Sequence, residues 1–301
     1  MSSDVPLIDQ VKTELVKIEN PNRRIVTNIM LLVVTVLIFY NLGTYGFSSS
    51  TLVTLIVVIF IHEMGHLLAM KAYGYKDITM FFIPLLGAAV TGRAINPVSS
   101  QKAIVSLMGP VPGILLGIVM IAAYETTHNP KFAEFAWFFL VINLLNMLPI
   151  HPLDGARFFD SLLFSRKPNV EIVFKYATCL VLGGMAWYLK APIMGIFTVM
   201  IFLSLRRMIP VANIAHEWRD RVSDQDKDKQ SMPNDMLIEV VNRLKLYDFN
   251  HHPRIIALAV LEVWQRVCNK AASLGTTILL VVLYIVMFSA GVAGLLSYQS
   301  L

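Results

Sequence analysis

Long apolar stretches separated by shorter polar ones dominate the chain. A helix needs about 20 consecutive, mainly apolar residues to cross the core of a bilayer. The stretches that reach or approach this length are residues 25–42, 52–70, 103–124, 135–150, 170–189, 192–205 and 277–296. We therefore expect an all-α polytopic membrane protein with about seven transmembrane helices, of which the sixth is the shortest.

A further apolar segment, residues 78–92, is too short to span a membrane and is interrupted by Pro84 and Gly87. Irregular backbone is tolerated at membrane depth only where it lies against protein or lines a wet cavity. We expect this segment to form a β-hairpin or re-entrant piece that dips into the membrane from the cytoplasmic side.

The longest polar region is residues 211–273. Residues 220–230 are highly charged, as is typical of a flexible linker. Residues 234–246 and 253–272 have helical periodicity, which predicts a small helical hairpin. The chain is thus divided into four parts, which are an N-terminal segment (1–24), a six-helix membrane core (25–210), a cytoplasmic helical segment (211–273) and a C-terminal transmembrane helix (274–301).

The distribution of positive charge indicates the orientation. With the N-terminus in the cytoplasm, all of the 25 lysine and arginine residues except Lys131 and Lys190 fall on the cytoplasmic side. This asymmetry is what the positive-inside rule describes, and it favours seven helices with the C-terminus outside. The first twenty residues lack the apolar core of a signal peptide, so we expect the first apolar helix to be retained.

Composition agrees with lipid as the solvent. The chain is 56% hydrophobic and only 15% charged, with a mean hydropathy of +0.63, whereas soluble domains carry about a quarter charged residues. The net charge of +5 is small for 301 residues, so no nucleic-acid partner is expected. Cys179 and Cys268 lie far apart and predict neither a disulfide framework nor a cysteine-ligated zinc site.

Three ionisable residues lie within the second apolar stretch, in the sequence HEMGH at residues 62–66. Positions i and i+4 share one face of a helix, so His62 and His66 can bind one metal ion while Glu63 reaches a water molecule on it. Ionisable groups inside a spanning helix are costly and are usually functional. The pattern is typical of zinc metalloproteases, and the alternative is a polar cluster whose members are satisfied by neighbouring helices.

A third protein ligand is expected, because catalytic zinc sites usually have three and keep one position open for water. Asp154 follows the fourth apolar stretch, which ends on the same side of the membrane as the second. Pro149 and Pro152 predict an unwound segment from which Asp154 can point back among the helices. The local sequence equally allows Asp154 to N-cap a short helix at residues 155–164.

The HEMGH sequence in a transmembrane helix, followed by NMLPIHPLDG after a later one, resembles the site-2 protease family of intramembrane zinc metalloproteases. The resemblance covers about residues 51–156. It includes the second motif of the family, matched here by Asn146, Pro149, Asp154 and Gly155. No segment has room for the PDZ domain of many bacterial members, so the chain resembles a small bacterial-type member.

The resemblance implies a set of roles for individual residues. One zinc ion per chain would be held by His62, His66 and Asp154, and Glu63 would be the catalytic base. Asn146 would orient the substrate or stabilise the oxyanion, although an interhelical hydrogen bond is an alternative role for this amide. Residues 25–210 would then form the protease core.

The resemblance also implies the substrate and the location. The enzyme would hydrolyse peptide bonds in or near transmembrane segments, for regulated proteolysis or the clearance of signal-peptide remnants, in the bacterial inner membrane with an active site open to the cytoplasm. A transmembrane substrate must unwind, and its freed backbone groups then need partners. Strand addition along the hairpin could supply them. The expected substrate-binding residues are Phe81, Phe82, Ile83, Pro84, Leu85, Leu86 and Gly87.

Two other functional classes stay open, namely a metal transporter that uses the His/Asp cluster and a non-catalytic metal-binding scaffold. Glu63 argues against the scaffold, because such a protein needs no base beside its metal. His151 stands where the family has an apolar residue, and it could contact a zinc ligand, gate the zinc or lie at the membrane interface. The sequence does not reveal the substrate's identity, the oligomeric state or the role of the last helix.

Overall fold

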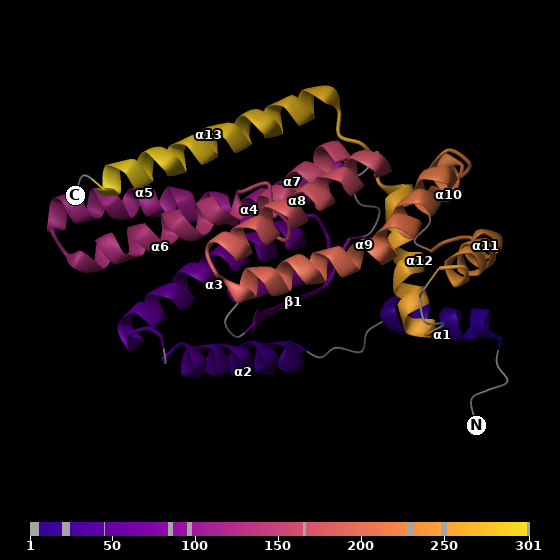
Figure 1. Cartoon of the computed structure of the whole chain (residues 1–301), viewed down its shortest axis with the longest axis horizontal. Coiled ribbons are helices and arrows are strands. Elements are labelled where there is room, and N and C mark those ends of the chain that lie inside the picture. The colour runs from indigo at the N-terminus through magenta and orange to yellow at the C-terminus, as the bar shows by residue number, and fades with distance from the viewer. Residues whose placement is uncertain are drawn as a thin grey trace. The chain divides into compact units, whose positions relative to one another are not determined.

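The computed structural model describes residues 6–19, 25–44, 46–83, 87–94, 98–164, 167–227, 231–247 and 252–299. Within these residues the chain is mostly helical, with one two-stranded sheet (Figure 1). It divides into two compact units. The site unit comprises Arg23–Ala94, Ser99–Leu162 and Ala272–Leu301, and the second unit comprises Met1–Asn22, Ile95–Val98 and Leu163–Ala271.

The elements of the site unit are α2 (Ile25–Gly43), α3 (Ser49–Ala72), β1 (Lys76–Ile83), β2 (Gly87–Arg93), α4 (Ser99–Met108), α5 (Pro110–Thr127), α6 (Pro130–Asn146), α7 (Asp154–Phe159) and α13 (Leu274–Gln299). Those of the second unit are α1 (Leu7–Glu19), α8 (Pro168–Tyr188), α9 (Pro192–Arg219), α10 (Asp224–Lys227), α11 (Asn234–Lys245) and α12 (Pro253–Cys268). A π-helical turn, Asp160–Phe164, follows α7.

Five helices of the described chain are long and apolar enough to cross a membrane, and they are Ser49–Ala72, Ser99–Thr127, Pro168–Tyr188, Met194–Arg219 and Leu274–Gln299. Two of the seven expected helices fall short of this criterion. The described apolar part of α2 is Ile29–Asn41, and α6 has 17 residues with Lys131 and Glu134 near its start. A polytopic membrane protein is therefore confirmed with five candidate spans, and the count of seven stays a prediction.

Local signals define the ends of α3, the helix that carries HEMGH. The Ser48 side chain accepts a hydrogen bond from the Thr51 N–H at 3.1 Å, which satisfies a donor that the first turn leaves open. At the other end Gly74 adopts a φ of 71°, a conformation that glycine takes without strain, and the chain turns into β1.

The expected hairpin is present as an antiparallel pair of strands, β1 and β2, with Met80 opposite Val90 and Phe82 opposite Ala88. The Phe82 ring is buried and meets the Phe39 ring of α2 edge to face, with the ring centres 5.6 Å apart. The hairpin is thereby fixed to α2. The tip residues Pro84, Leu85 and Leu86 lie outside the described residues.

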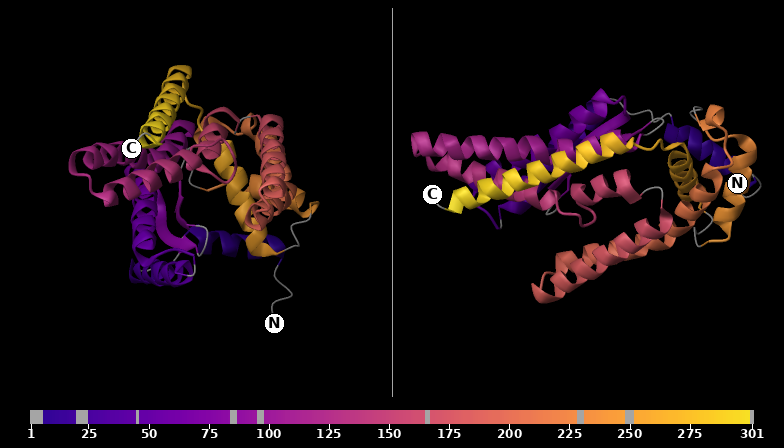
Figure 2. Two further views of the ribbon diagram at one scale, coloured as in Figure 1. Left: turned by 60° about the vertical axis from the view of Figure 1, so that its left-hand side comes forward. Right: turned by 90° about the horizontal axis from the view of Figure 1, so that it is seen from above.

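The last helix, α13, is an integral part of the site unit. It runs beside α5 and α6 (Figures 1 and 2). Its inward side chains share one hydrophobic core with residues of α5, α6 and α7. The core residues that connect these helices are Leu280, Tyr284 and Met287 with Ile114, Leu140, Met147 and Phe158. The helix for which the sequence suggested no role thus supports the packing around the candidate site.

The second unit contains the expected helical hairpin, formed by α11 and α12. The N-terminal helix α1 packs against α12 and buries Val11 and Leu15 in the same core. Helix α9 passes Pro210 without interruption and enters this core with Val211 and Ile214.

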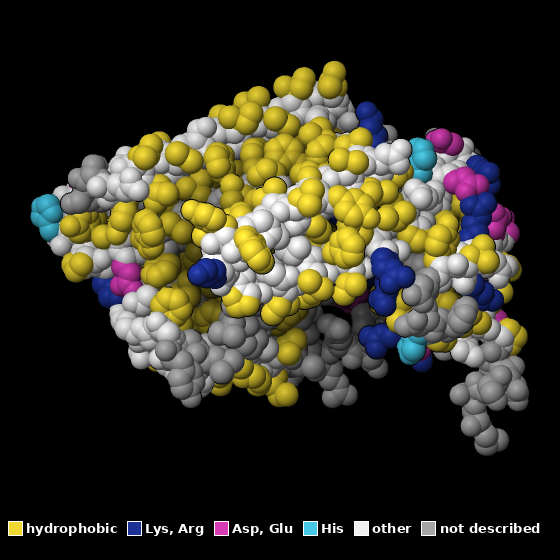
Figure 3. Space-filling model, viewed as in Figure 1, with side chains coloured by type: hydrophobic (Ala, Val, Ile, Leu, Met, Phe, Trp, Pro, Cys, Tyr) yellow, Lys and Arg dark blue, Asp and Glu magenta, His cyan; other side chains and the backbone are white. Residues whose placement is uncertain are grey.

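The division of the chain into four parts, which the sequence suggested, stays a prediction. Hydrophobic side chains cover much of α8, α9 and α13, whereas charged side chains gather over α10, α11 and α12 (Figure 3).

Candidate metal centre

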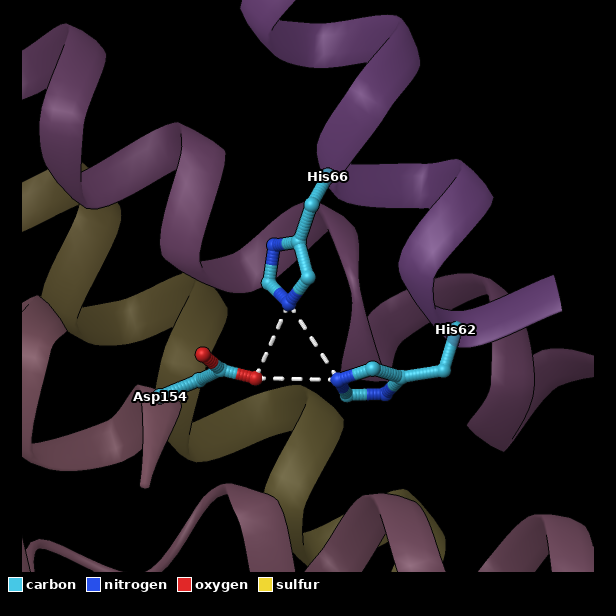
Figure 4. Close-up of side chains that lie close together, drawn as sticks. All are labelled: His62, His66 and Asp154. Atoms are coloured by element: carbon cyan, nitrogen blue, oxygen red, sulfur yellow. Dashed lines mark hydrogen bonds and ion pairs between the residues drawn. The ribbon is translucent and has the colours of Figure 1, made fainter. Parts of the chain in front are cut away.

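Three side chains that are distant in sequence converge inside the site unit (Figure 4). His62 and His66 lie one turn apart on α3, and Asp154 is the first residue of α7. The Asp154 Oδ2 atom lies 3.0 Å from Nε2 of each imidazole, and the two Nε2 atoms are 3.2 Å apart. Each residue exposes 6% or less of its surface. The structure thus brings together the three ligands that the sequence predicted.

The second nitrogen of each imidazole determines which atom faces the centre. His66 Nδ1 lies 2.7 Å from the carbonyl oxygen of Val105, which can only accept a hydrogen bond, so this nitrogen carries the proton. His62 Nδ1 lies 2.7 Å from Asn143 Oδ1. In the neutral form, each imidazole therefore has its lone pair on Nε2, which faces Asp154, as ligation of a metal requires.

Asn143 is a candidate positioning residue that the sequence did not indicate. It is fully buried, and its Nδ2 donates to the Phe139 carbonyl at 2.7 Å, which leaves Oδ1 to face His62. Gly113 of α5 faces this amide so closely that a Cβ at that position would collide with it. A polar amide in an apolar helix was the available signal, but its partner is set by the packing of α3, α5 and α6.

The break between α4 and α5 lets backbone approach the centre. A Cβ at Gly109 would overlap the ring of His66 and crowd that of His62, so only glycine fits there. Pro110 follows immediately and has no N–H to continue the hydrogen bonds of α4. The Gly-Pro pair therefore ends one helix, starts the next and makes room for both imidazoles.

Asp154 is held by the turn between α6 and α7. The Tyr284 hydroxyl of α13 donates to the Met147 carbonyl at the end of α6, and the Leu153 N–H donates to the Ile150 carbonyl at 2.9 Å. Asp154 Oδ1 lies 3.6 Å from an Arg157 guanidinium nitrogen. No N-capping hydrogen bond is made by a side chain at the start of α7, so the alternative role of Asp154 as an N-cap is not seen.

Glu63 lies next to His62 on α3 and exposes 8% of its surface. Within the described part of the chain, its carboxylate makes no hydrogen bond and no ion pair. A buried carboxylate without a partner is costly unless it serves a function. Its carboxylate interacts electrostatically with the two imidazoles and with Asp154, so it belongs to the surroundings of the centre.

The donor set fits zinc. Two lone-pair nitrogens and a carboxylate oxygen face one another, an arrangement that needs a cation between them. For ligand distances of about 2.0–2.2 Å, a tetrahedral ion places its ligand atoms about 3.3–3.6 Å apart. The observed separations of 3.0–3.2 Å are close to these values. The number of ions per chain stays a prediction.

The remaining predicted site residues lie apart from this cluster. The Asn146 amide donates to the Ile142 carbonyl of its own helix at 3.0 Å, and among the described residues it has no hydrogen bond to the centre. His151 is half-buried in the turn before α7 and is not among the ligand atoms that converge. Their roles stay predictions.

The predicted substrate-binding residues are partly described. The Phe82 side chain is buried between α2 and α3, its N–H donates to Thr35 Oγ1, and Phe81 is half-buried. Ile83 and Gly87 are described only as the strand ends next to the undescribed tip. No described contact bears on a substrate, so this set also stays a prediction.

Comparisons with known proteins agree with this geometry. Residues 50–135 match the sequence profile of peptidase family M50. The chain is 25% identical over 187 residues to "Stage IV sporulation protein FB" of Bacillus subtilis, which covers 60% of this chain and 62% of that protein. It is 25% identical over 122 residues to "Zinc metalloprotease MJ0392" of Methanocaldococcus jannaschii, covering 39% of this chain and 35% of that protein. The chain therefore spans less than two thirds of either relative.

The fold and the site define a multi-pass membrane protein with a buried centre of the zinc-metalloprotease type. The chain is similar to peptidase family M50 over residues 50–135, which is less than half of its length. The matched segment contains HEMGH and ends before Asp154, so the third ligand comes from the geometry of the structure and not from that match.

Proposed function

We propose that this protein is an intramembrane zinc metalloprotease that hydrolyses peptide bonds in or near the transmembrane segments of membrane proteins. The observation that carries the proposal is the buried Glu63 carboxylate, which has no hydrogen-bond or ion-pair partner among the described residues and lies beside the cluster of metal-binding side chains. Glu63 and both histidines belong to α3, a helix that is long and apolar enough to span a membrane. The relative named as a zinc metalloprotease supports this activity.

A zinc ion, when bound, supplies a Lewis acid that polarises the scissile carbonyl and makes water more acidic. Glu63 accepts the proton of the attacking water and later donates it to the leaving amine. Asn143 and the Val105 carbonyl hold the two imidazoles in the tautomer that presents Nε2. The buried surroundings limit access of bulk water, which strengthens electrostatic interactions with the substrate.

The hairpin supports substrate binding by strand addition. The Phe82 N–H donates to Thr35 Oγ1 at 2.9 Å instead of across the ladder, so the pair of Phe82 and Ala88 turns its backbone groups outward. Val90, two residues further, then turns its N–H outward from β2 as well. Among the described residues, neither Ala88 nor Val90 donates a backbone hydrogen bond beyond the hairpin, so this edge can pair with an unwound peptide.

The proposed orientation has the N-terminus in the cytoplasm, the C-terminus outside and the centre open to the cytoplasm of a bacterial cell. The near-complete confinement of lysine and arginine to the cytoplasmic segments supports it. The substrate would be a transmembrane protein or peptide.

Zinc analysis and a cleavage assay on one preparation test the activity. Wild type and Glu63→Gln are reconstituted in liposomes with a tagged single-span membrane protein. We expect Glu63→Gln to keep its zinc and to lose about 10²–10⁴-fold in cleavage rate, because the amide cannot take the proton. Cleavage by Glu63→Gln at the wild-type rate would contradict the proposal. Equal zinc uptake into liposomes by both proteins without cleavage would favour the transporter.

A proline at the outward edge of β2 tests strand addition. Val90→Pro removes an N–H that points away from β1, and a proline is tolerated at such a position, so the hairpin and the zinc content should persist while cleavage is lost. Val90→Thr keeps the N–H and the β-branched shape, and it should cleave like wild type. Normal cleavage by Val90→Pro would show that this edge does not hold the substrate.

A further inference from the structure

The surroundings of helix α9 in the second unit change at two consecutive arginines, Arg206 and Arg207. Before them its large apolar side chains are exposed, including Val199, Met200 and Leu203 at 55–61%. After them Val211 is buried in the core shared with α11 and α12. An exposed apolar face on a candidate membrane span is a face for lipid. The pair Arg206–Arg207 therefore marks the level at which α9 leaves the bilayer.

An open cavity of about 1050 Å³ lies at this level, between α8, α9 and α12 of the second unit. Its apolar wall includes Met200 and Leu203 of α9 and Leu258 of α12. Its basic wall includes Arg206 and Arg207. Figure 3 shows lysine and arginine side chains where the hydrophobic surface of α9 ends. The cavity thus joins a lipid-facing apolar surface to a cationic rim.

The cationic rim keeps an excess of positive charge. Lys175, which lines the cavity, bonds the buried Glu171 at 2.8 Å, and Arg266 bonds the same carboxylate at 2.7 and 2.9 Å. Glu262 on the rim lies 3.0 Å from the same Arg266. Arg207 is exposed and has no ion pair with any described residue. The acidic groups nearby are therefore neutralised, while a permanent cation stays available.

The surface next to the cavity is suited to a membrane interface. Tyr247 lines the cavity, and Leu246 beside it exposes 83% of its surface. Tyrosine is enriched where membranes meet water, because its ring is apolar and its hydroxyl is polar. Exposed apolar side chains of this kind would be unfavourable in water but are stabilised among lipid headgroups.

We propose that this cavity binds an anionic phospholipid, with its phosphate at Arg206 and Arg207 and its acyl chains along Met200 and Leu203. Basic pockets at the cytoplasmic ends of transmembrane helices are suited to anionic headgroups. Arginine pairs with phosphate through two parallel hydrogen bonds. A zwitterionic phospholipid gains less, because its own cation competes for the phosphate. A free phosphate compound would leave the apolar wall without a partner.

Native mass spectrometry of the full-length protein tests the proposal. The protein is released from detergent micelles that contain either phosphatidylglycerol or phosphatidylcholine with identical acyl chains. We expect wild type to retain phosphatidylglycerol preferentially. At about 1 kcal/mol for each basic residue near a membrane surface, Arg207→Gln should weaken retention about fivefold and Arg206→Gln/Arg207→Gln about 30-fold. Lys190→Gln, at the turn between α8 and α9 and outside the cavity, is the matched control and should retain lipid like wild type.

Two further arms separate the remaining outcomes. Ser204→Trp should fill the cavity and reduce retention without removing charge, so it also serves if the double variant is unstable. Excess inorganic phosphate should not displace the lipid, because the apolar wall contributes to binding. Equal retention of both lipids by wild type, unchanged retention in a folded double variant, or displacement by inorganic phosphate would each overturn the proposal.

Discussion

Two buried carboxylates, one in each unit, are held in contrasting ways. Glu171 of the second unit exposes 1% of its surface and is bonded by Arg266 through two hydrogen bonds and by Lys175. Asp154 of the site unit exposes 5%, and its nearest partners are two imidazoles that keep their protons on the far nitrogen. Glu171 is neutralised by permanent cations in direct contact, whereas the nearest contacts of Asp154 are imidazoles and the Arg157 guanidinium lies farther away at 3.6 Å. Burial of an acidic group does not by itself identify a metal site. The charge of the side chains that contact the group is more informative.

The largest expected effect comes from removing the carboxylate of the metal centre. Asp154→Ala leaves only two imidazole ligands, so zinc per chain should fall to near zero and cleavage should stop. Metal analysis of the purified protein measures this directly. The apo variant should stay folded, because the imidazoles still bond Asn143 and Val105. A normal zinc content in Asp154→Ala would mean that the contrast between the two carboxylates is wrong.

The matching change in the second unit should act on stability and not on zinc. Glu171→Ala leaves Arg266 without its buried partner, and breaking a buried ion pair costs about 3–5 kcal/mol. We expect a lower midpoint of denaturation with an unchanged zinc content. Glu171→Met/Arg266→Met removes both charges and should recover much of the loss. If Glu171→Ala loses zinc, the two carboxylates are not independent.

The smallest expected effect concerns the hydrogen bond that orients the His62 imidazole. Asn143→Leu removes the acceptor that fixes the tautomer of His62, and changes of this kind cost about 10–100-fold in metal affinity. Competition with a chromophoric chelator measures the affinity. Asn146→Leu is the matched control on the same helix, since among the described residues this amide bonds only the Ile142 carbonyl, and it should keep the wild-type affinity. Equal affinities for both variants would exclude a positioning role of Asn143.

The HEMGH half of the centre could be predicted because it depends on one local rule. His62 and His66 share a face on any α-helix, so their convergence needs no tertiary information. Asp154 could not be assigned in this way, since an aspartate before a short helix can also be a cap. The position of α7 decides between the two roles, because the helix begins at Asp154 itself and its carboxylate faces the imidazoles.

Features that depend on packing escaped prediction. The partner of Asn143 is set by how closely α5 approaches α6 at Gly113. Hydropathy located the apolar segments but not their lengths as helices. Helix α9 extends to Arg219 because its last turns pack in a core with α11 and α12 instead of facing lipid. The average hydropathy of a segment does not distinguish these two apolar surroundings.

The hydrogen bond from Tyr284 to the Met147 carbonyl has a consequence for biogenesis. Translation proceeds from the N-terminus, so α3 and α6 are synthesised well before α13. The turn that presents Asp154 acquires its support from Tyr284 only when the last described helix has been inserted. Maturation of the centre is therefore a late event, because the turn that presents Asp154 is complete only after α13 has joined α6.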